Sequence, residues 1–329
     1  MSCNNYFSAV RDNLLEGPLC VQLEISGKCI AKCVTCSNKE YTGLKHPTLE
    51  ENKEIIKKLK DSGVKAIRLT GGEPILADQF DKVVAYCKKQ KIKASITTTL
   101  LTKNEDYMTA LLDVSPIKVS LSTVGDEYHK FFGIPDKNFN VVKKNLDFLK
   151  ENKKRFSVNY TIFEDNYSIE SLTNFIEFMN DYKPSYVTFF PALMFDHPEA
   201  KEIVRNLKEV SSLCNFRSNI LTVGKHFARR KPKENLVCHI NKFHAHIKNN
   251  GDVYPCCMTG GEVGQNLNKK LLLGNLHNQS MKNIYKKKFD IFEGVNMTKF
   301  DECKECTQRY TMLNQEFDSF INDEKFREL

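Results

Sequence analysis

The sequence lacks any long apolar run. Its first 28 residues hold no continuous apolar segment, and no later stretch gives about 18 uncharged apolar residues in a row. These absences exclude a signal peptide and a membrane span, so we expect a cytoplasmic protein with no membrane partner. No internal repeat or low-complexity tract is present. With 329 residues, 41% of them hydrophobic, the chain can bury a sizeable core, which excludes a disordered chain and a small disulfide scaffold.

The chain has only a modest excess of positive charge. Its 49 lysines and arginines against 41 acidic residues give a formal net charge of +8, spread over short basic runs. We interpret these runs as solvated faces that keep the protein in solution, with a phosphorylated or acidic substrate as the alternative. The charge therefore gives no reason to expect a nucleic acid as partner.

Twelve cysteines need an explanation in such a chain. A reducing compartment disfavours structural disulfides and leaves metal binding or redox catalysis as the usual reasons for clustered thiols. Cys3, Cys20, Cys87 and Cys214 stand apart and are interpreted as ordinary small hydrophobic residues. The others form one group near the start of the chain and one near its end.

Short runs of strand-forming residues alternate with helical patterns from residue 18 to about 211. The expected strands are 19–25, 65–69, 93–99, 117–121, 156–162 and 186–190. The expected helices are 49–60, which Thr48 and Glu51 begin as a capping box, and 77–90, 104–113, 137–152, 168–181 and 197–212. Such repeated βα units predict an α/β fold, a partial (β/α)6 TIM-like barrel with its active site at the carboxyl ends of the strands.

The alternation fades after about residue 212, and a smaller second domain is expected there. We assign residues 1–227 to the barrel and 228–329 to a C-terminal domain that holds the second group of cysteines. An Asn250-Gly251 pair inside it is typical of a hairpin turn.

Three thiols, Cys29, Cys33 and Cys36, follow the first predicted strand within eight residues. Three thiolates can hold three irons of a 4Fe–4S cluster and leave the fourth iron open, whereas a structural zinc site wants a fourth protein ligand. Taken alone, such a loop also fits a zinc knuckle or a redox thiol group. The C-x3-C-x2-C spacing, with Gly71-Gly72-Glu73-Pro74 after the next strand, resembles the radical S-adenosylmethionine (SAM) superfamily.

That resemblance implies a catalytic cluster whose open iron binds SAM. It further implies that SAM is bound at the ends of the second, third and fourth strands. The residues concerned are Gly71, Gly72, Glu73, Thr97, Thr99, Ser120 and Ser122. Glycine at the first two positions lets backbone carbonyls approach the methionyl amine.

Four cysteines of the second group can close a complete cage around zinc or a second 4Fe–4S cluster. They are Cys238, Cys256, Cys303 and Cys306. Their order along the chain resembles the twitch module, a shortened SPASM extension of radical SAM enzymes, which implies one auxiliary 4Fe–4S cluster. Cys257 is left over, as a buried spare, an alternative ligand or a hydrogen-atom donor to the substrate. His239, His244 and His246 are interpreted as packing or surface groups.

The resemblance implies a radical SAM oxidoreductase or epimerase that cleaves SAM reductively and removes a hydrogen atom from an unactivated C–H bond. It also implies a low-potential electron donor such as a flavodoxin or ferredoxin as partner. Only 28 residues precede Cys29, too few for a leader-binding domain, so we expect a small polar substrate such as an aminocyclitol, sugar or nucleotide sugar. Tyr160, Phe189, Phe190 and Arg217 are candidates to line its pocket, with an ordinary core or surface position as the equal alternative.

Three other functions remain open at this point. One is a maturase that epimerises or cross-links a ribosomally made peptide. Another is an iron–sulfur activator that acts on a partner protein. The third is a zinc-stabilised binding module without redox chemistry.

Overall fold

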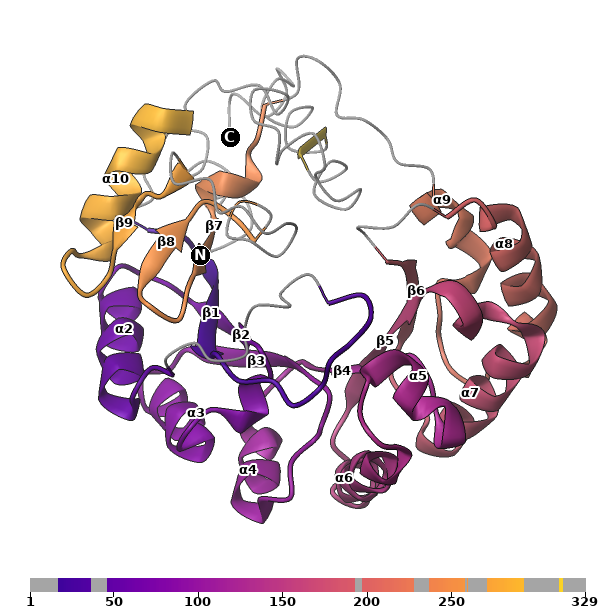
Figure 1. The fold of residues 1–329 in the computed structure, drawn as a ribbon. Coiled ribbons are helices and arrows are strands. Elements are labelled where there is room, and N and C mark those ends of the chain that lie inside the picture. Colours follow the sequence, from indigo (N-terminus) through magenta and orange to yellow (C-terminus); the bar gives the residue numbers. More distant parts are fainter. Residues whose placement is uncertain are drawn as a thin grey trace.

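The structure is a computed structural model that describes residues 17–36, 46–192, 197–227, 237–257, 259, 271–292 and 314–315. Figure 1 shows a strongly curved sheet with helices outside it. None of the helices in the described ranges is both long and apolar enough to cross a membrane.

Nine strands of the described chain form one sheet (Figure 1). They are β1 (Cys20–Ser26), β2 (Ala66–Gly71), β3 (Lys93–Thr98), β4 (Ile117–Ser120), β5 (Phe156–Ile162), β6 (Val187–Pro191), β7 (His244–Ile247), β8 (Asp252–Tyr254) and β9 (Gly274–Asn275). Their order across the sheet is β6-β5-β4-β3-β2-β1-β7-β8-β9, and the strands from β6 to β1 are parallel. This part confirms the predicted partial (β/α)6 barrel.

Helices cover the outside of the barrel (Figure 1). Six of them correspond to the predicted ranges: α2 (Leu49–Asp61), α3 (Phe80–Lys89), α4 (Glu105–Ala110), α6 (Phe139–Glu151), α7 (Ile169–Tyr182) and α8 (Ala200–Glu209). The described chain also has α5 (Tyr128–Phe132), α9 (Gly224–Phe227) and α10 (Met281–Phe292), which were not among the predicted barrel helices. The capping box of α2 is confirmed, because the Thr48 hydroxyl accepts from Glu51 N and the Glu51 carboxylate accepts from Thr48 N.

The two faces of the barrel strands differ in polarity. Alternate residues such as Leu23, Leu69 and Ile96 are fully buried and pack in one hydrophobic core with the apolar faces of the helices. The residues between them face the inside of the barrel, because side chains alternate along a strand. The inward set includes Gln22, Glu24, Arg68, Thr70, Ser95, Thr97, Lys118, Ser120, Asn159, Thr161, Thr188 and Phe190. The barrel interior is therefore mainly polar.

The C-terminal region extends the barrel sheet, which the sequence did not reveal. β7 pairs in parallel with β1, placing His246 opposite Gln22, and β8 and β9 then add antiparallel strands. Gly251, with φ of 84°, forms the predicted hairpin turn between β7 and β8. The predicted boundary near residue 228 lies outside the described residues and stays a prediction.

Candidate active site

The loop that carries the first three cysteines follows β1 and is fixed by α5. Lys32 N donates to Phe132 O at 2.8 Å, and Val34 N donates to Phe131 O at 3.1 Å. A side chain at Gly133 would not fit, since its Cβ would lie 2.8 Å from Lys32 O. The backbone of the loop is thus held by the segment that follows β4.

The glycines after β2 form the other wall of this loop. Gly72 N donates to Ser26 O at 3.0 Å, and Glu73 N donates to Lys28 O at 2.6 Å. A Cβ at Gly72 would lie 2.4 Å from Lys28 O and 3.1 Å from Cys29 N. At Gly71, with φ of 132°, a Cβ would lie 2.1 Å from Ser26 O. Both positions therefore need glycine, because the backbone of β2 and the start of the cysteine loop are in close contact.

The donor set of the loop fits an open iron–sulfur cluster. Cys29, Cys33 and Cys36 lie on one short loop, and Cys36 N donates to Cys33 O at 3.1 Å. Burial and then the charge of Glu73 raise the pKa of Cys29 to about 12, so ligand binding must remove protons from these groups. Within the described residues, no group of three or more His, Cys, Asp or Glu side chains is placed so that it could hold a metal ion.

Glu73 is fully enclosed by protein groups. Its carboxylate accepts from the Thr98 hydroxyl at 2.5 Å, from the Thr99 hydroxyl at 2.6 Å and from Thr99 N at 2.7 Å. Ile75 N adds a longer bond of 3.3 Å. Burial raises the pKa of Glu73, while these donors act in the opposite direction. Glu73 therefore ties the end of β2 to the end of β3, and Thr98 is a member of this site that the sequence analysis missed.

The hydroxyl residues predicted to contact SAM occupy two different environments. Thr97 and Ser120 are partly exposed on the inner face of the barrel. Thr99 and Ser122 are buried, the first bonded to Glu73 and the second accepting from Thr161 N at 3.0 Å. The first two are open to a ligand in the barrel, and the latter two hold neighbouring strands together.

The second group of cysteines is only partly described. Cys256 follows β8, and its backbone and thiol both contact the Thr259 hydroxyl. Cys238 Sγ lies 4.0 Å from Asn314 Nδ2. Cys303 and Cys306 lie outside the described residues, so the predicted four-thiol cage stays a prediction. Cys257 is buried, with 5% of its surface exposed.

The expected pocket residues are mostly placed elsewhere. Tyr160 and Phe189 are fully buried on the helix side of the sheet, where both rings pack against Phe175. Arg217 lies at the amino end of β6, where its carbonyl accepts from Val187 N. The prediction that these three line the pocket is therefore wrong, because alternation along the strands directs the two rings outward. Phe190 alone faces inward.

A buried charged cluster near the inner end of β1 was missed. Glu24 Oε1 accepts from His246 Nε2 at 2.9 Å and from Lys248 Nζ at 2.8 Å, and His246 Nδ1 contacts Gln22 Oε1 at 3.0 Å. Burial alone would raise the pKa of Glu24, but His246 and Lys248 outweigh it and lower that pKa to about 2. His246 is thus neither a plain packing residue nor a surface group.

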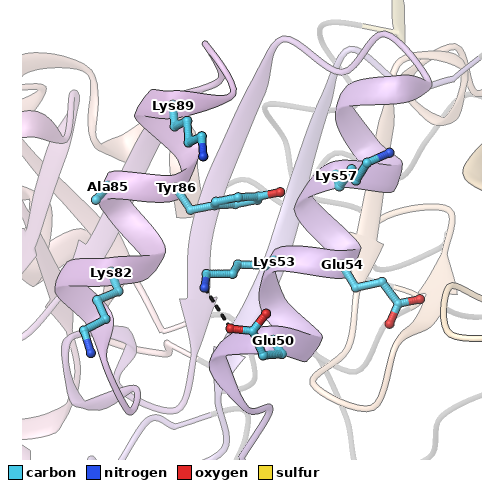
Figure 2. A pocket seen from close by; sticks show the side chains of 8 residues that line it. All are labelled: Glu50, Lys53, Glu54, Lys57, Lys82, Ala85, Tyr86 and Lys89. Carbon is cyan, nitrogen blue, oxygen red and sulfur yellow. Dashed lines mark hydrogen bonds and ion pairs between the residues drawn. The ribbon is translucent and has the colours of Figure 1, made fainter.

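A groove on the outside of the barrel lies between α2 and α3 and has a volume of about 610 Å³. Figure 2 shows its lysine and glutamate side chains, with Lys53 Nζ bonded to Glu50 Oε1 at 2.8 Å. It opens on the helical surface and contains neither cysteines nor the inward strand residues. The cysteine loop and the barrel interior therefore form the candidate active site.

Two groups of known proteins resemble part of this chain in sequence. The chain is 34% identical over 114 residues to a probable GTP 3′,8-cyclase of Methanococcus maripaludis strain C6, covering 33% of this chain and 38% of that protein. It is 27% identical over 113 residues to a PqqA peptide cyclase of Bradyrhizobium diazoefficiens, covering 33% of this chain and 30% of that protein. The chain thus spans only 30% to 41% of the length of the curated relatives it matches.

Solved structures resemble the fold of this chain over more of its length than the curated relatives match its sequence. The crystal structure of SuiB of Streptococcus suis bound to S-adenosylmethionine matches with a TM-score of 0.67 and 17% identity, covering 91% of this chain and 74% of SuiB. The family model of the radical SAM superfamily matches residues 23–179, and that of the SPASM iron–sulfur cluster-binding domain matches residues 238–307. The chain therefore belongs to the radical SAM superfamily, whose cofactors are SAM and 4Fe–4S clusters, and carries a SPASM domain after its barrel.

Proposed function

We propose that this radical SAM enzyme dehydrogenates or epimerises a small polar substrate such as an aminocyclitol, sugar or nucleotide sugar. The observation that carries the substrate class is the polar inner face of the barrel. Arg68 and Lys118 provide positive charge there, among the hydroxyl and amide groups of other strands. Few positioned polar groups suffice to orient a small hydrophilic molecule.

The residues of the site divide into ligands, contacts and supports. Cys29, Cys33 and Cys36 hold the catalytic cluster in this proposal. The backbone at Gly71 and Gly72, together with the partly exposed Thr97 and Ser120, contacts SAM. Glu73, Thr99 and Ser122 are positioning residues, since their polar atoms are already bonded to other strand ends. Cys238, Cys256, Cys303 and Cys306 hold one auxiliary 4Fe–4S cluster.

Cys29, Cys33 and Cys36 would hold the catalytic cluster, which would supply reductive cleavage of SAM and hydrogen-atom abstraction, and the auxiliary cluster would supply electron exchange with the substrate. The chain itself fixes where this occurs. The close contacts of Gly72 and the bonds of Glu73 leave the cysteine loop little freedom, so a substrate in the barrel meets a fixed reaction centre. An external donor such as a flavodoxin or ferredoxin provides the electrons.

Cys257 is the candidate that separates epimerisation from dehydrogenation. If Cys257 donates a hydrogen atom, its S–H bond breaks while a C–H bond forms on the substrate radical. One electron from the external flavodoxin or ferredoxin and one proton from solvent would then restore the thiol. In D2O the wild type would then label the product, and Cys257→Ala would not. Oxidised product without label from both proteins supports dehydrogenation instead.

A peptide maturase is the second candidate. The PqqA peptide cyclase match and the fold of SuiB, which has also been crystallised with its precursor peptide SuiA, favour it. The match to the probable GTP 3′,8-cyclase favours a small polar substrate. Because the fold is common to both kinds of protein, the polar barrel interior is what inclines us to the small substrate.

The deciding experiment measures 5′-deoxyadenosine formed by the reduced, anaerobically reconstituted enzyme. Nucleotides, nucleotide sugars and aminocyclitols are compared with linear peptides. We expect a small polar compound to accelerate SAM cleavage, and Lys118→Met to raise its KM by about tenfold, as loss of one charged contact of roughly 1.4 kcal/mol would do. Lys53→Met, in the outer groove of Figure 2, is the matched control and is expected to leave that KM unchanged. Acceleration by peptides alone would refute the small-substrate proposal.

A further inference from the structure

Tyr128 is a fully buried tyrosine whose hydroxyl has no hydrogen-bond partner in the part of the chain that the structure describes. A buried hydroxyl without a partner loses its hydration and gains nothing in return. The hydroxyl therefore contributes little to the stability of the folded chain by itself. The position of Tyr128 relative to the cysteine loop suggests a role for it.

The tyrosine lies in the helix that holds the cysteine loop. Its ring stacks on that of Phe132, with centroids 4.4 Å apart and planes inclined by 19°. The same turn of α5 accepts the loop's backbone bonds, from Lys32 to Phe132 and from Val34 to Phe131. Tyr128 is therefore packed on Phe132, whose carbonyl holds the segment that contains the predicted ligands.

The electrostatic surroundings of the hydroxyl point to the same place. Burial raises the pKa of Tyr128, and the negative charges of Cys33, Glu73 and Cys29 raise it further. Glu73 already accepts four hydrogen bonds, from Ile75 N, Thr99 N and the hydroxyls of Thr98 and Thr99. The Tyr128 hydroxyl is therefore left without a partner among the described residues, and the other two charges that act on it belong to predicted cluster ligands.

We propose that the Tyr128 hydroxyl donates a hydrogen bond to a sulfur of the catalytic cluster and makes that cluster easier to reduce. The proposal rests on the assignment of Cys29, Cys33 and Cys36 as its ligands. Reduction adds negative charge to the cluster, and a donor aimed at sulfur stabilises that charge, so the reduction potential rises. Tyr128 is thus a positioning and tuning residue that does not itself touch the substrate.

The test compares holoenzymes of the wild type, Tyr128→Phe and Tyr182→Phe. Tyr182 is also buried, but its hydroxyl donates to Asp147 on the outer helices. Each protein is titrated with reductant, and the EPR signal that changes when SAM is added identifies the catalytic cluster. For Tyr128→Phe we expect the ratio of reduced to oxidised cluster at a fixed potential to fall about tenfold, which is about 59 mV for one electron. Tyr182→Phe should match the wild type.

Equal potentials for Tyr128→Phe and the wild type would overturn the proposal, as would an equal shift in Tyr182→Phe. A raised SAM KM with an unchanged potential would overturn it too, by assigning the hydroxyl to SAM. If Tyr128→Phe does not fold, site-specific 3,5-difluorotyrosine keeps the ring and makes a stronger donor, which should raise the potential. The assignment of Cys29, Cys33 and Cys36 as ligands is tested separately with Cys29→Ala. If that assignment is wrong, this variant keeps the EPR signal that changes when SAM is added.

Discussion

Glu24 on β1 and His246 on β7 form a buried pair, with 2.9 Å between Oε1 and Nε2 and 1% of each side chain exposed. On the other side of the same ring, His246 Nδ1 lies 3.0 Å from Gln22 Oε1. The pair joins the strand that leads into the cysteine loop to the hairpin that leads into Cys256. It therefore links the two regions in which the clusters are proposed to lie.

Removing one member of this pair should destabilise the protein. Glu24→Gln leaves His246 and Lys248 buried beside an uncharged amide, and breaking a buried pair in this way costs about 3 kcal/mol or more. Guanidinium unfolding should show a correspondingly lower midpoint. The control is Glu50→Gln, whose exposed bond to Lys53 in Figure 2 contributes little. Equal midpoints for the two variants would show that the Glu24 pair is not important for stability.

The same carboxylate predicts a pH dependence. The pKa of Glu24 is about 2 in the folded protein and ordinarily about 4.5, so its ionised form stabilises the fold above about pH 4.5. That contribution is lost as the pH falls from 4.5 towards 2. The difference in unfolding free energy between the wild type and Glu24→Gln should thus shrink as the pH falls below about 4.5. A difference that grows on acidification would contradict this sign.

Glu73→Gln should impair SAM cleavage while the cluster remains bound. The amide brings two N–H donors to a position where Thr98 and Thr99 already donate, so the ends of β2 and β3 lose their common acceptor. Loss of a charge-assisted bond of about 1.5–3 kcal/mol corresponds to a roughly 10- to 100-fold slower reaction. Glu54→Gln in the outer groove makes the same chemical change without this contact. Normal 5′-deoxyadenosine formation by Glu73→Gln would argue against its supporting role.

Gly72→Ala should displace the cysteine loop. The added Cβ would meet the backbone of Lys28 and Cys29, which cannot move without moving the first ligand. Iron analysis after reconstitution should show the loss of most of the catalytic cluster. In Gly224→Ala the Cβ would make an ordinary contact of 3.4 Å with Val204, so this variant should keep its iron. Full iron content in both variants would mean that the close approach at Gly72 does not matter for cluster binding.

The parts of the structure that local sequence patterns determine could be predicted well. The six parallel strands follow from runs of apolar residues between helical periods, and Thr48 with Glu51 marks the start of α2. The cysteine spacing and the Gly71-Gly72 pair indicated the loop and its wall, because both are short-range features. These positions depend on residues only a few places apart in the chain.

Pairings between distant residues could not be predicted in this way. Glu24 and His246 are 222 positions apart, and only the pairing of β7 with β1 brings them together. Thr98 was overlooked between Thr97 and Thr99, because which of three consecutive hydroxyls faces the barrel depends on the strand's phase. The same uncertainty about which residues of a strand face inward misplaced Tyr160 and Phe189. Both lie at strand positions that face the helices, where their rings are buried in the core.

The central claim is that Cys29, Cys33 and Cys36 hold the catalytic cluster. The most direct measurement is iron and sulfide per chain after anaerobic reconstitution, together with SAM cleavage, for the wild type and the triple cysteine-to-alanine variant. The account predicts that the variant loses about four irons and four sulfides, keeps those of the auxiliary cluster, and forms no 5′-deoxyadenosine. Unchanged iron and sulfide with continued SAM cleavage would contradict it.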